Sequence, residues 1–288
     1  MIFWLLSFGL SNRYLKSAEV TDGNLPQSGK CGDQLTWSLS NSNSQLTISG
    51  QGAMTDYSFK EDVPWFVHYQ TISSITVESS ATSVGDWAFS YLPNLNSVSL
   101  PDTITTIGAH SFSFCTSLET ISLPSNVQTI SSSAFEKCFK LTSISFGNSL
   151  TDIGPDCFSC CTSLERVTLP NTAIQLDVYS FYYCTSLVEM NFGSSLQVID
   201  SFAFFNCSSL TSISFPDTLT TIGDFSFRYC SRIQSISIPS QVDYIGKSAF
   251  WHMTSLQSIS VDSKNQNFKS SEGVLYNDDY SILIQFPT

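Results

Sequence analysis

A phenylalanine recurs every 23 residues through most of the chain, without one insertion or deletion. The series has eight members, Phe89, Phe112, Phe135, Phe158, Phe181, Phe204, Phe227 and Phe250, here called the in-phase phenylalanines. A small residue precedes each of them, and apolar residues follow three, six, nine and eleven positions later. Seven consecutive periods in one phase exclude a chance pattern, so the chain is built from structural repeats.

This repeat predicts a solenoid, a stack of similar coils around one shared core. A fixed period of about 20 to 29 residues with the pattern L-x-x-I-x-L is typical of leucine-rich repeats. One coil cannot enclose a core, whereas stacked coils bury each side chain against its neighbours, which stabilises the fold by roughly 1.5–3 kcal/mol per side chain. We therefore expect a leucine-rich-repeat solenoid. A parallel β-sheet would form one face, as at residues 120–123, and short turns or 3₁₀ helix the other, as at residues 133–137.

The phase of the repeat divides the chain into four parts. Residues 1–30 are expected to form a leader and linker. Within residues 31–80, two short segments, 35–39 and 46–48, alternate apolar and polar side chains around a turn-rich stretch, which predicts two strands and a small β-rich N-terminal cap. Residues 81–268 hold about eight repeats, and residues 269–288 predict a terminal β-hairpin. An uncapped solenoid exposes its core, so we interpret the chain as a truncated piece, or a short relative, of a longer protein.

The leader contains one apolar run. Residues 2–10, IFWLLSFGL, match the length of a signal-peptide core but fall short of the roughly 20 residues that span a bilayer. We interpret the run as part of a secretory signal, and a buried N-terminal strand is the alternative. The remaining sequence contains no run that predicts a transmembrane helix. The expected location is therefore the cell surface or the extracellular medium.

The charge balance limits the partners. The chain carries 12 Lys and Arg against 24 Asp and Glu, a formal net charge of −12. Nucleic acids and anionic membranes bind clustered cations, so neither is an expected partner. Charged residues make up only 12% of the chain, so Ser, Thr and Asn must supply most of the polar surface.

Six of the nine cysteines occupy one position of the repeat, three residues after the in-phase phenylalanine. They are Cys115, Cys138, Cys161, Cys184, Cys207 and Cys230. We expect them to form an inward column of small apolar side chains. Disulfides between neighbouring coils are the alternative, because coils about 4.8 Å apart bring the Cα atoms within range. Cys31 and Cys160 lie outside the column, as free thiols or contacts between chains.

No combination of residues predicts catalysis, a cofactor or a metal site. Cys157, Cys160 and Cys161 resemble half of a zinc site, but no second pair has matching spacing. None of the three histidines lies beside a nucleophile motif, and a glycine-rich phosphate loop is absent from the sequence. We therefore expect a protein that is not an enzyme.

The outward side chains of the predicted sheet form the first candidate binding surface. Most of them are Ser or Thr, but two neighbouring coils carry charged or amide side chains instead. The candidate residues on this face are Thr120, Ser122, Arg166, Thr168, Glu189 and Asn191. Arg166 and Glu189 are 23 residues apart, so they should be cross-strand neighbours. The alternative is an ordinary soluble surface of hydrogen-bonded hydroxyl groups.

The second candidate surface is aromatic. The two positions after the in-phase phenylalanine hold Tyr182, Tyr183, Phe205, Tyr229 and Trp251. Such a loop buries at most one of its faces, so some of these rings should be exposed and suited to contact a protein or a glycan. Lateral packing between coils is the alternative.

The repeat pattern also resembles a known family. The pattern (A/S)-F-x-x-C-x-x-L-x-x-I-x-(L/I/F)-P-x-x-(V/L)-x-x-I-G is similar to the BspA-type leucine-rich repeat. Residues 31–59 resemble the segment that often precedes these repeats, and residues 273–287 resemble a hairpin often inserted between repeat blocks. The family occurs in surface proteins of oral and gut bacteria and of trichomonad parasites.

This resemblance implies a non-enzymatic surface protein that binds host or extracellular-matrix proteins or glycans, as in adhesion. The family has no universal ligand residues, so the resemblance identifies none in this chain. The main alternative is a structural or antigenic surface solenoid without a dedicated ligand. An ice-binding solenoid is less favoured, because that function needs a flat Thr-rich face and this face is rich in Ser.

Overall fold

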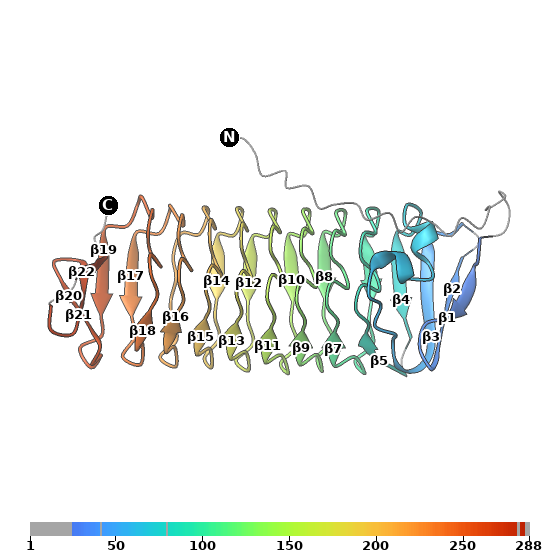
Figure 1. Ribbon diagram of the computed structural model, residues 1–288, viewed down its shortest axis with the longest axis horizontal. Coiled ribbons are helices and arrows are strands. Elements are labelled where there is room, and N and C mark those ends of the chain that lie inside the picture. Colours follow the sequence, from blue (N-terminus) through green and yellow to red (C-terminus); the bar gives the residue numbers. More distant parts are fainter. Residues whose placement is uncertain (1–24, 41, 79, 281–282, 286–288) are drawn as a thin grey trace.

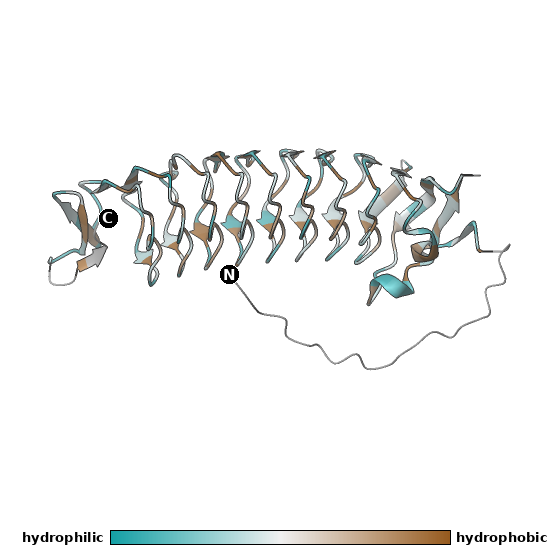
Figure 2. Ribbon diagram, turned by 90° about the horizontal axis from the view of Figure 1, so that it is seen from above, coloured by the Kyte–Doolittle hydropathy of each residue, from teal (hydrophilic) through white to brown (hydrophobic). Residues whose placement is uncertain are grey.

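The computed structural model describes residues 25–40, 42–78, 80–280 and 283–285. These residues form one elongated stack of coils with many short strands and almost no helix (Figure 1). The coils stand side by side in a single row when they are seen from above (Figure 2). The predicted leucine-rich-repeat solenoid is therefore confirmed. The apolar run at residues 2–10 lies outside the described residues.

The N-terminal part is an antiparallel sheet that continues into the solenoid. Strands β1 (Ser28–Lys30), β2 (Gln34–Leu39) and β3 (Gln45–Ala53) pair antiparallel, and β2 and β3 include both strands predicted there. β3 then pairs in parallel with β4 (Ser74–Val77) and β5 (Ser80–Val84).

Two tryptophans from this part close the N-terminal end of the core. Two short 3₁₀ helices, η1 (Lys60–Asp62) and η2 (Phe66–His68), lie in the loop between β3 and β4. The Trp65 ring, beside η2, stacks on Phe89 at 5.8 Å between centroids, and Trp37 contacts Trp65 edge-on at 5.7 Å. The first ring of the solenoid is therefore covered by apolar side chains.

In every coil except the one with residues 212–215, one strand belongs to the predicted parallel sheet, here called the face sheet. Its strands are β6 (Ser97–Ser99), β8 (Thr120–Ser122), β10 (Ser143–Ser145), β12 (Arg166–Thr168), β14 (Glu189–Asn191), β17 (Ser235–Ile238) and β19 (Ser258–Val261). Strands β8 to β14 form one four-stranded sheet, β17 pairs with β19, and β6 pairs with β4. The period-two pattern of the sequence predicted these strands because one side of each is buried.

A second strand in each coil was not predicted. These two-residue strands are β7 (Thr106–Ile107), β9 (Thr129–Ile130), β11 (Asp152–Ile153), β13 (Gln175–Leu176), β15 (Val198–Ile199), β16 (Thr221–Ile222) and β18 (Tyr244–Ile245). They pair in parallel with a register of one repeat and continue the sheet that begins at β1. Two residues are too few to produce a recognisable alternation in sequence.

The turns around the in-phase phenylalanines form a third side of each coil, here called the turn edge. It runs from two residues before each in-phase phenylalanine to two residues after it. Both end positions have left-handed backbone, for example His110 with φ 55° and Phe114 with φ 59°. Because left-handed residues interrupt a helix, the structure here shows turns rather than the 3₁₀ helix that was the other expected form.

The core is a column of stacked phenylalanine rings. The centroids from Phe112 to Phe227 are 5.1 to 5.4 Å apart, and each of these side chains is fully buried. The six in-phase cysteines are buried free thiols, as predicted, and each donates to the carbonyl oxygen of a phenylalanine one coil earlier. The Cys138 sulfur, for example, lies 3.2 Å from the Phe112 oxygen.

The C-terminal end is an antiparallel sheet. Strands β20 (Phe268–Ser271), β21 (Val274–Asn277) and β22 (Leu283–Gln285) follow the last coil. The buried Asn265 side chain precedes them and bonds four backbone groups. Its Nδ2 donates to the Pro239 and Val242 oxygens at 2.8 and 3.0 Å, and its Oδ1 accepts from the amides of Asn267 and Phe268 at 2.8 and 2.9 Å.

We expect the Asn265→Ala substitution to lower the free energy of unfolding by about 3 kcal/mol, because it leaves buried backbone groups without partners. The measurement is the midpoint and slope of urea-induced unfolding. The neighbouring Asn267→Ala substitution is the control, since Asn267 is exposed and its change should stay within about 0.5 kcal/mol. Equal losses in the two variants would contradict the bridging role of Asn265.

Candidate binding surface

The charged pair on the face sheet lies where the sequence predicted it. β12 and β14 pair in parallel with Arg166 opposite Glu189 and Thr168 opposite Asn191. The Arg166 guanidinium and the Glu189 carboxylate form an ion pair, and both side chains are exposed. Exposed ion pairs contribute roughly 0–1 kcal/mol to stability. The pair therefore shapes the surface more than it stabilises the fold.

The other candidate residues on this face are also exposed, and Ser122 and Asn191 form local hydrogen bonds. Thr120 and Ser122 lie on β8, and the Ser122 hydroxyl accepts a 2.8 Å hydrogen bond from Ser145. The Asn191 side-chain oxygen Oδ1 accepts from the Gly193 amide at 3.1 Å. These contacts agree with a hydrogen-bonded hydroxyl face, and they leave Arg166 and Glu189 as its distinctive charged groups.

The predicted aromatic residues form a connected group, here called the aromatic edge: Tyr182, Tyr183, Phe205, Tyr229 and Trp251. Tyr182 stacks on Phe205 at 5.2 Å and contacts Tyr183 at 4.6 Å. Phe205 meets Tyr229 edge-on at 5.3 Å. Tyr183 and Trp251 keep 38% and 44% of their surface exposed, and the other three rings are half-buried.

An arginine that the sequence reasoning missed links the aromatic edge together. The Arg228 guanidinium lies 4.2 Å from the Trp251 ring centroid and 4.8 Å from that of Tyr229. Both distances fall within the roughly 6 Å range of cation–π attraction. Arg228 occupies the repeat position directly after the in-phase phenylalanine, as Tyr182, Phe205 and Trp251 do. That shared repeat position was the sequence feature that could have identified Arg228 as part of this group.

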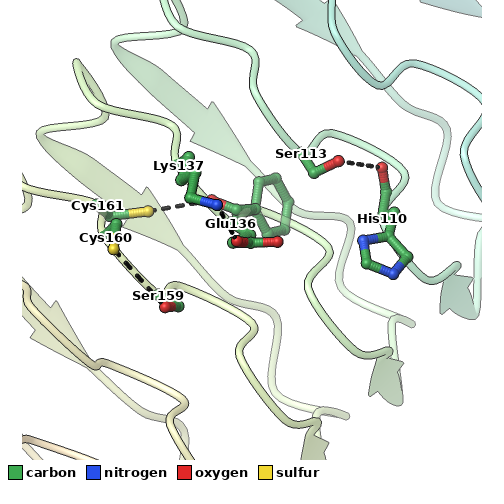
Figure 3. A network of polar contacts seen from close by, with 8 residues as sticks. His110, Ser113, Glu136, Lys137, Ser159, Cys160 and Cys161 are labelled. Atoms are coloured by element: carbon green, nitrogen blue, oxygen red, sulfur yellow. Dashed lines mark hydrogen bonds and ion pairs between the residues drawn. The ribbon is translucent and has the colours of Figure 1, made fainter. Parts of the chain in front are cut away.

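The turn edge changes from aromatic to polar in the middle of the solenoid. There Lys137 and Glu136 form a 2.7 Å ion pair, and the Ser159 hydroxyl lies 3.9 Å from the Cys160 sulfur (Figure 3). The Lys137 ammonium also lies 4.6 Å from the Phe114 ring centroid. This polar stretch separates Phe114 and the earlier rings from the aromatic edge.

The polar stretch lacks the geometry of nucleophilic catalysis. The Ser113 hydroxyl donates to the His110 backbone oxygen at 3.1 Å, so it does not engage the imidazole ring (Figure 3). Burial raises the pKa of the Cys160 thiol above its ordinary value, which disfavours the reactive thiolate. Burial likewise lowers the pKa of His110, whose ring stacks on Trp87 at 4.1 Å.

A metal site and a membrane-spanning helix are both absent from the part of the chain that the structure describes. It contains no group of three or more His, Cys, Asp or Glu side chains arranged to hold a metal ion. Within the same residues, no helix has the length and apolar character needed to cross a membrane.

Comparison with known proteins identifies the family to which the repeat belongs. The family model described as the BspA type leucine-rich repeat region matches residues 64–165 and 151–272, in six copies. No sequence among the curated proteins matches this chain.

Two solved structures share the fold. A leucine-rich repeat protein from Bacteroides ovatus aligns over 81% of this chain and 70% of its own length, with 21% identity and a TM-score of 0.57. A leucine rich cell surface protein from Faecalibacterium prausnitzii aligns over 92% of this chain, with 23% identity and a TM-score of 0.54. This chain spans 62% of the length of that second protein. From the in-phase repeats and the matched family model, the chain belongs to the BspA-type leucine-rich repeat family.

Proposed function

We propose that the chain is a non-catalytic binding scaffold, displayed at the cell surface or secreted, that engages host or matrix proteins or glycans through the aromatic edge. The supporting observation is that rings from three successive coils meet and Arg228 links Trp251 of the next coil to them, while Tyr183 and Trp251 stay 38% and 44% exposed. Exposed apolar groups that gather on a folded protein mark interaction sites. Aromatic side chains and arginine are also enriched at such sites.

The orientation of the rings favours a protein over a glycan. The Tyr182 and Phe205 planes are inclined by 23°, and those of Tyr183 and Phe205 by 27°, so each stack covers ring faces. Stacked rings present their edges to solvent. Ring edges suit apolar contacts with protein side chains, whereas a sugar ring lies best on an open aromatic face.

The charged pair on the face sheet is the second candidate surface. Arg166 and Glu189 are exposed, but each already holds the other as its partner. A ligand would have to replace that ion pair, whereas the aromatic edge has apolar surface free to bury. The aromatic edge is therefore the preferred site.

The test is capture of proteins from a host-cell or matrix extract by the purified chain. We expect the Tyr183→Ser/Trp251→Ser variant to lose about ten-fold or more of the captured partner, because an aromatic hot spot contributes about 2 kcal/mol or more. The matched control is Ile174→Ser, whose side chain is 41% exposed elsewhere on the solenoid.

Other variants separate the remaining possibilities. The Arg166→Ser/Glu189→Ser variant should retain full capture. Loss of capture in this variant would place the binding site on the face sheet instead of the aromatic edge. Capture by the unaltered chain that is no better than by the double aromatic variant would favour a structural or antigenic solenoid without a dedicated ligand.

A further inference from the structure

Arg228 lies among aromatic rings without a carboxylate partner. In the described part of the chain it forms an ion pair with no Asp or Glu. Its Nη2 donates to the Tyr229 hydroxyl at 3.2 Å, and its buried Nε donates to no group in those residues. The acidic residue nearest to it in sequence, Asp224, already accepts from the Lys247 amide at 2.7 Å and from the Tyr244 hydroxyl at 3.2 Å. Most of the guanidinium donors therefore remain unused within these residues.

Lys137, in the polar stretch of the same turn edge, shows how a cation is otherwise accommodated there. Its ammonium lies over the Phe114 ring, 4.6 Å from the centroid, and it also forms a 2.7 Å ion pair with Glu136. Arg228 has the ring contact, 4.2 Å from the Trp251 centroid, but not the carboxylate. Apolar surroundings cannot solvate a cation as water does. An anionic ligand at Arg228 would therefore complete the arrangement that the chain itself supplies at Lys137.

The rings limit the kind of anion that suits this place. The guanidinium lies over the Trp251 ring, so a ligand must approach the donors that the ring leaves uncovered. A carboxylate is planar and can accept two parallel hydrogen bonds from one guanidinium. A doubly charged phosphate would lose more hydration among apolar rings, because the free energy of hydration grows with the square of the charge. The carboxylate is therefore the favoured anion.

We propose that Arg228 makes the aromatic edge specific for a partner protein that presents an Asp or Glu side chain beside apolar residues. The carboxylate would pair with the guanidinium, and the apolar neighbours would cover the exposed parts of Tyr183 and Trp251. The net charge of −12 repels an acidic partner at long range. The pair therefore acts at short range, where it selects among partners. This inference rests on the proposed function, because it names the partner chemistry of the same surface.

The test uses two short peptides that differ at one residue. Each has blocked termini and a central Leu-X-Leu sequence in a frame of serine and glycine, where X is glutamate in one peptide and glutamine in the other. Binding to the full, isotope-labelled chain is followed by NMR, from the Nε–H signal of Arg228 and the indole N–H signal of Trp251. We expect the glutamate peptide to bind at least ten-fold more tightly, because charge-assisted hydrogen bonds are the stronger ones.

Substitutions at Arg228 separate the roles of its charge and its shape, with the Trp251 indole signal as the readout. Arg228→Gln should remove the preference, so that the two peptides bind equally. Arg228→Lys should reduce the preference to about three-fold or less, because an ammonium lacks the planar pair of donors. The matched control is Arg232→Gln. Arg232 is exposed and lies four residues later in the same coil, so its loss should leave the preference unchanged.

The outcomes distinguish this inference from the proposed function. Equal binding of the two peptides by the unaltered chain would overturn the inference, as would the absence of binding by either peptide. The proposed function is judged separately, by capture with the Tyr183→Ser/Trp251→Ser variant. A preference that survives in Arg228→Gln would also overturn the inference. Tighter binding of free sialic acid than of the glutamate peptide would overturn it as well, and would assign the guanidinium to an acidic glycan.

Discussion

Replacement of Phe158 by alanine is expected to lower the free energy of unfolding by about 4 kcal/mol, within the range of about 3–5 kcal/mol known for buried phenylalanines. The ring is fully buried and stacks on Phe135 at 5.4 Å and on Phe181 at 5.1 Å. Removal therefore leaves a cavity in the middle of the column and breaks two ring contacts. Urea-induced unfolding followed by circular dichroism gives the measurement.

Phe139→Ala is the matched control for this substitution. Phe139 lies four residues after an in-phase phenylalanine and is 41% exposed. Its loss should change the free energy of unfolding by less than about 1 kcal/mol. Comparable losses in the two variants would contradict the assignment of the phenylalanine column as the main source of stability.

Alkaline pH is expected to unfold the solenoid steeply. Burial raises the pKa of Cys115 from an ordinary value of 9.0 to about 12, and it raises the pKa of the other five in-phase thiols as well. The unfolded chain therefore releases these protons at a lower pH than the folded chain. The thiols contribute their full stability below pH 9, and that contribution falls as the pH rises toward their folded-state pKa values.

The expected magnitude is large because six thiols act together. Each loses roughly 1–2 kcal/mol for each pH unit above 9, so six lose on the order of 8 kcal/mol at pH 10. That loss is comparable with the whole stability of a typical domain, about 5–15 kcal/mol. The free energy of unfolding, measured between pH 7 and pH 10.5 in urea under reducing conditions, checks the prediction.

A triple variant tests the cause of this pH dependence. Cys138→Ala/Cys161→Ala/Cys207→Ala removes three of the eight buried thiols whose pKa burial raises, since Cys31 and Cys157 belong with the six in-phase ones, so the slope of the free energy against pH should fall by roughly a third. The slope is the readout, because the cavities created by alanine lower stability at every pH alike. An unchanged slope would assign the alkaline unfolding to other groups.

The sequence predicted the core of this protein well, because the core repeats. Phe112, Cys115 and Leu118 are ambiguous when they are read alone, but eight copies at one period identify them as inward positions of stacked coils. The same phase predicted Arg166 beside Glu189, since a residue 23 positions later must lie on the next strand. The binding roles proposed for these residues stay predictions.

What the repeat could not predict lies where local geometry departs from the average coil. The backbone is left-handed at His110 and Phe114, and each coil has a second strand of only two residues. Both features depend on hydrogen bonds between coils, and neither produces an alternating pattern in the sequence. Arg228 was overlooked because its importance comes from the rings that surround it and not from its own residue type.

The sequence by itself determined the period, the inward residues and the family, because one buried pattern repeated without a gap admits only a stacked core. The tertiary structure alone decided where strand pairing in the face sheet stops. β6 and β8 do not pair, and residues 212–215 form no strand, although the repeat continues in phase through both places. Pairing needs the backbone groups of neighbouring coils within hydrogen-bond distance, which the apolar pattern of one coil does not set.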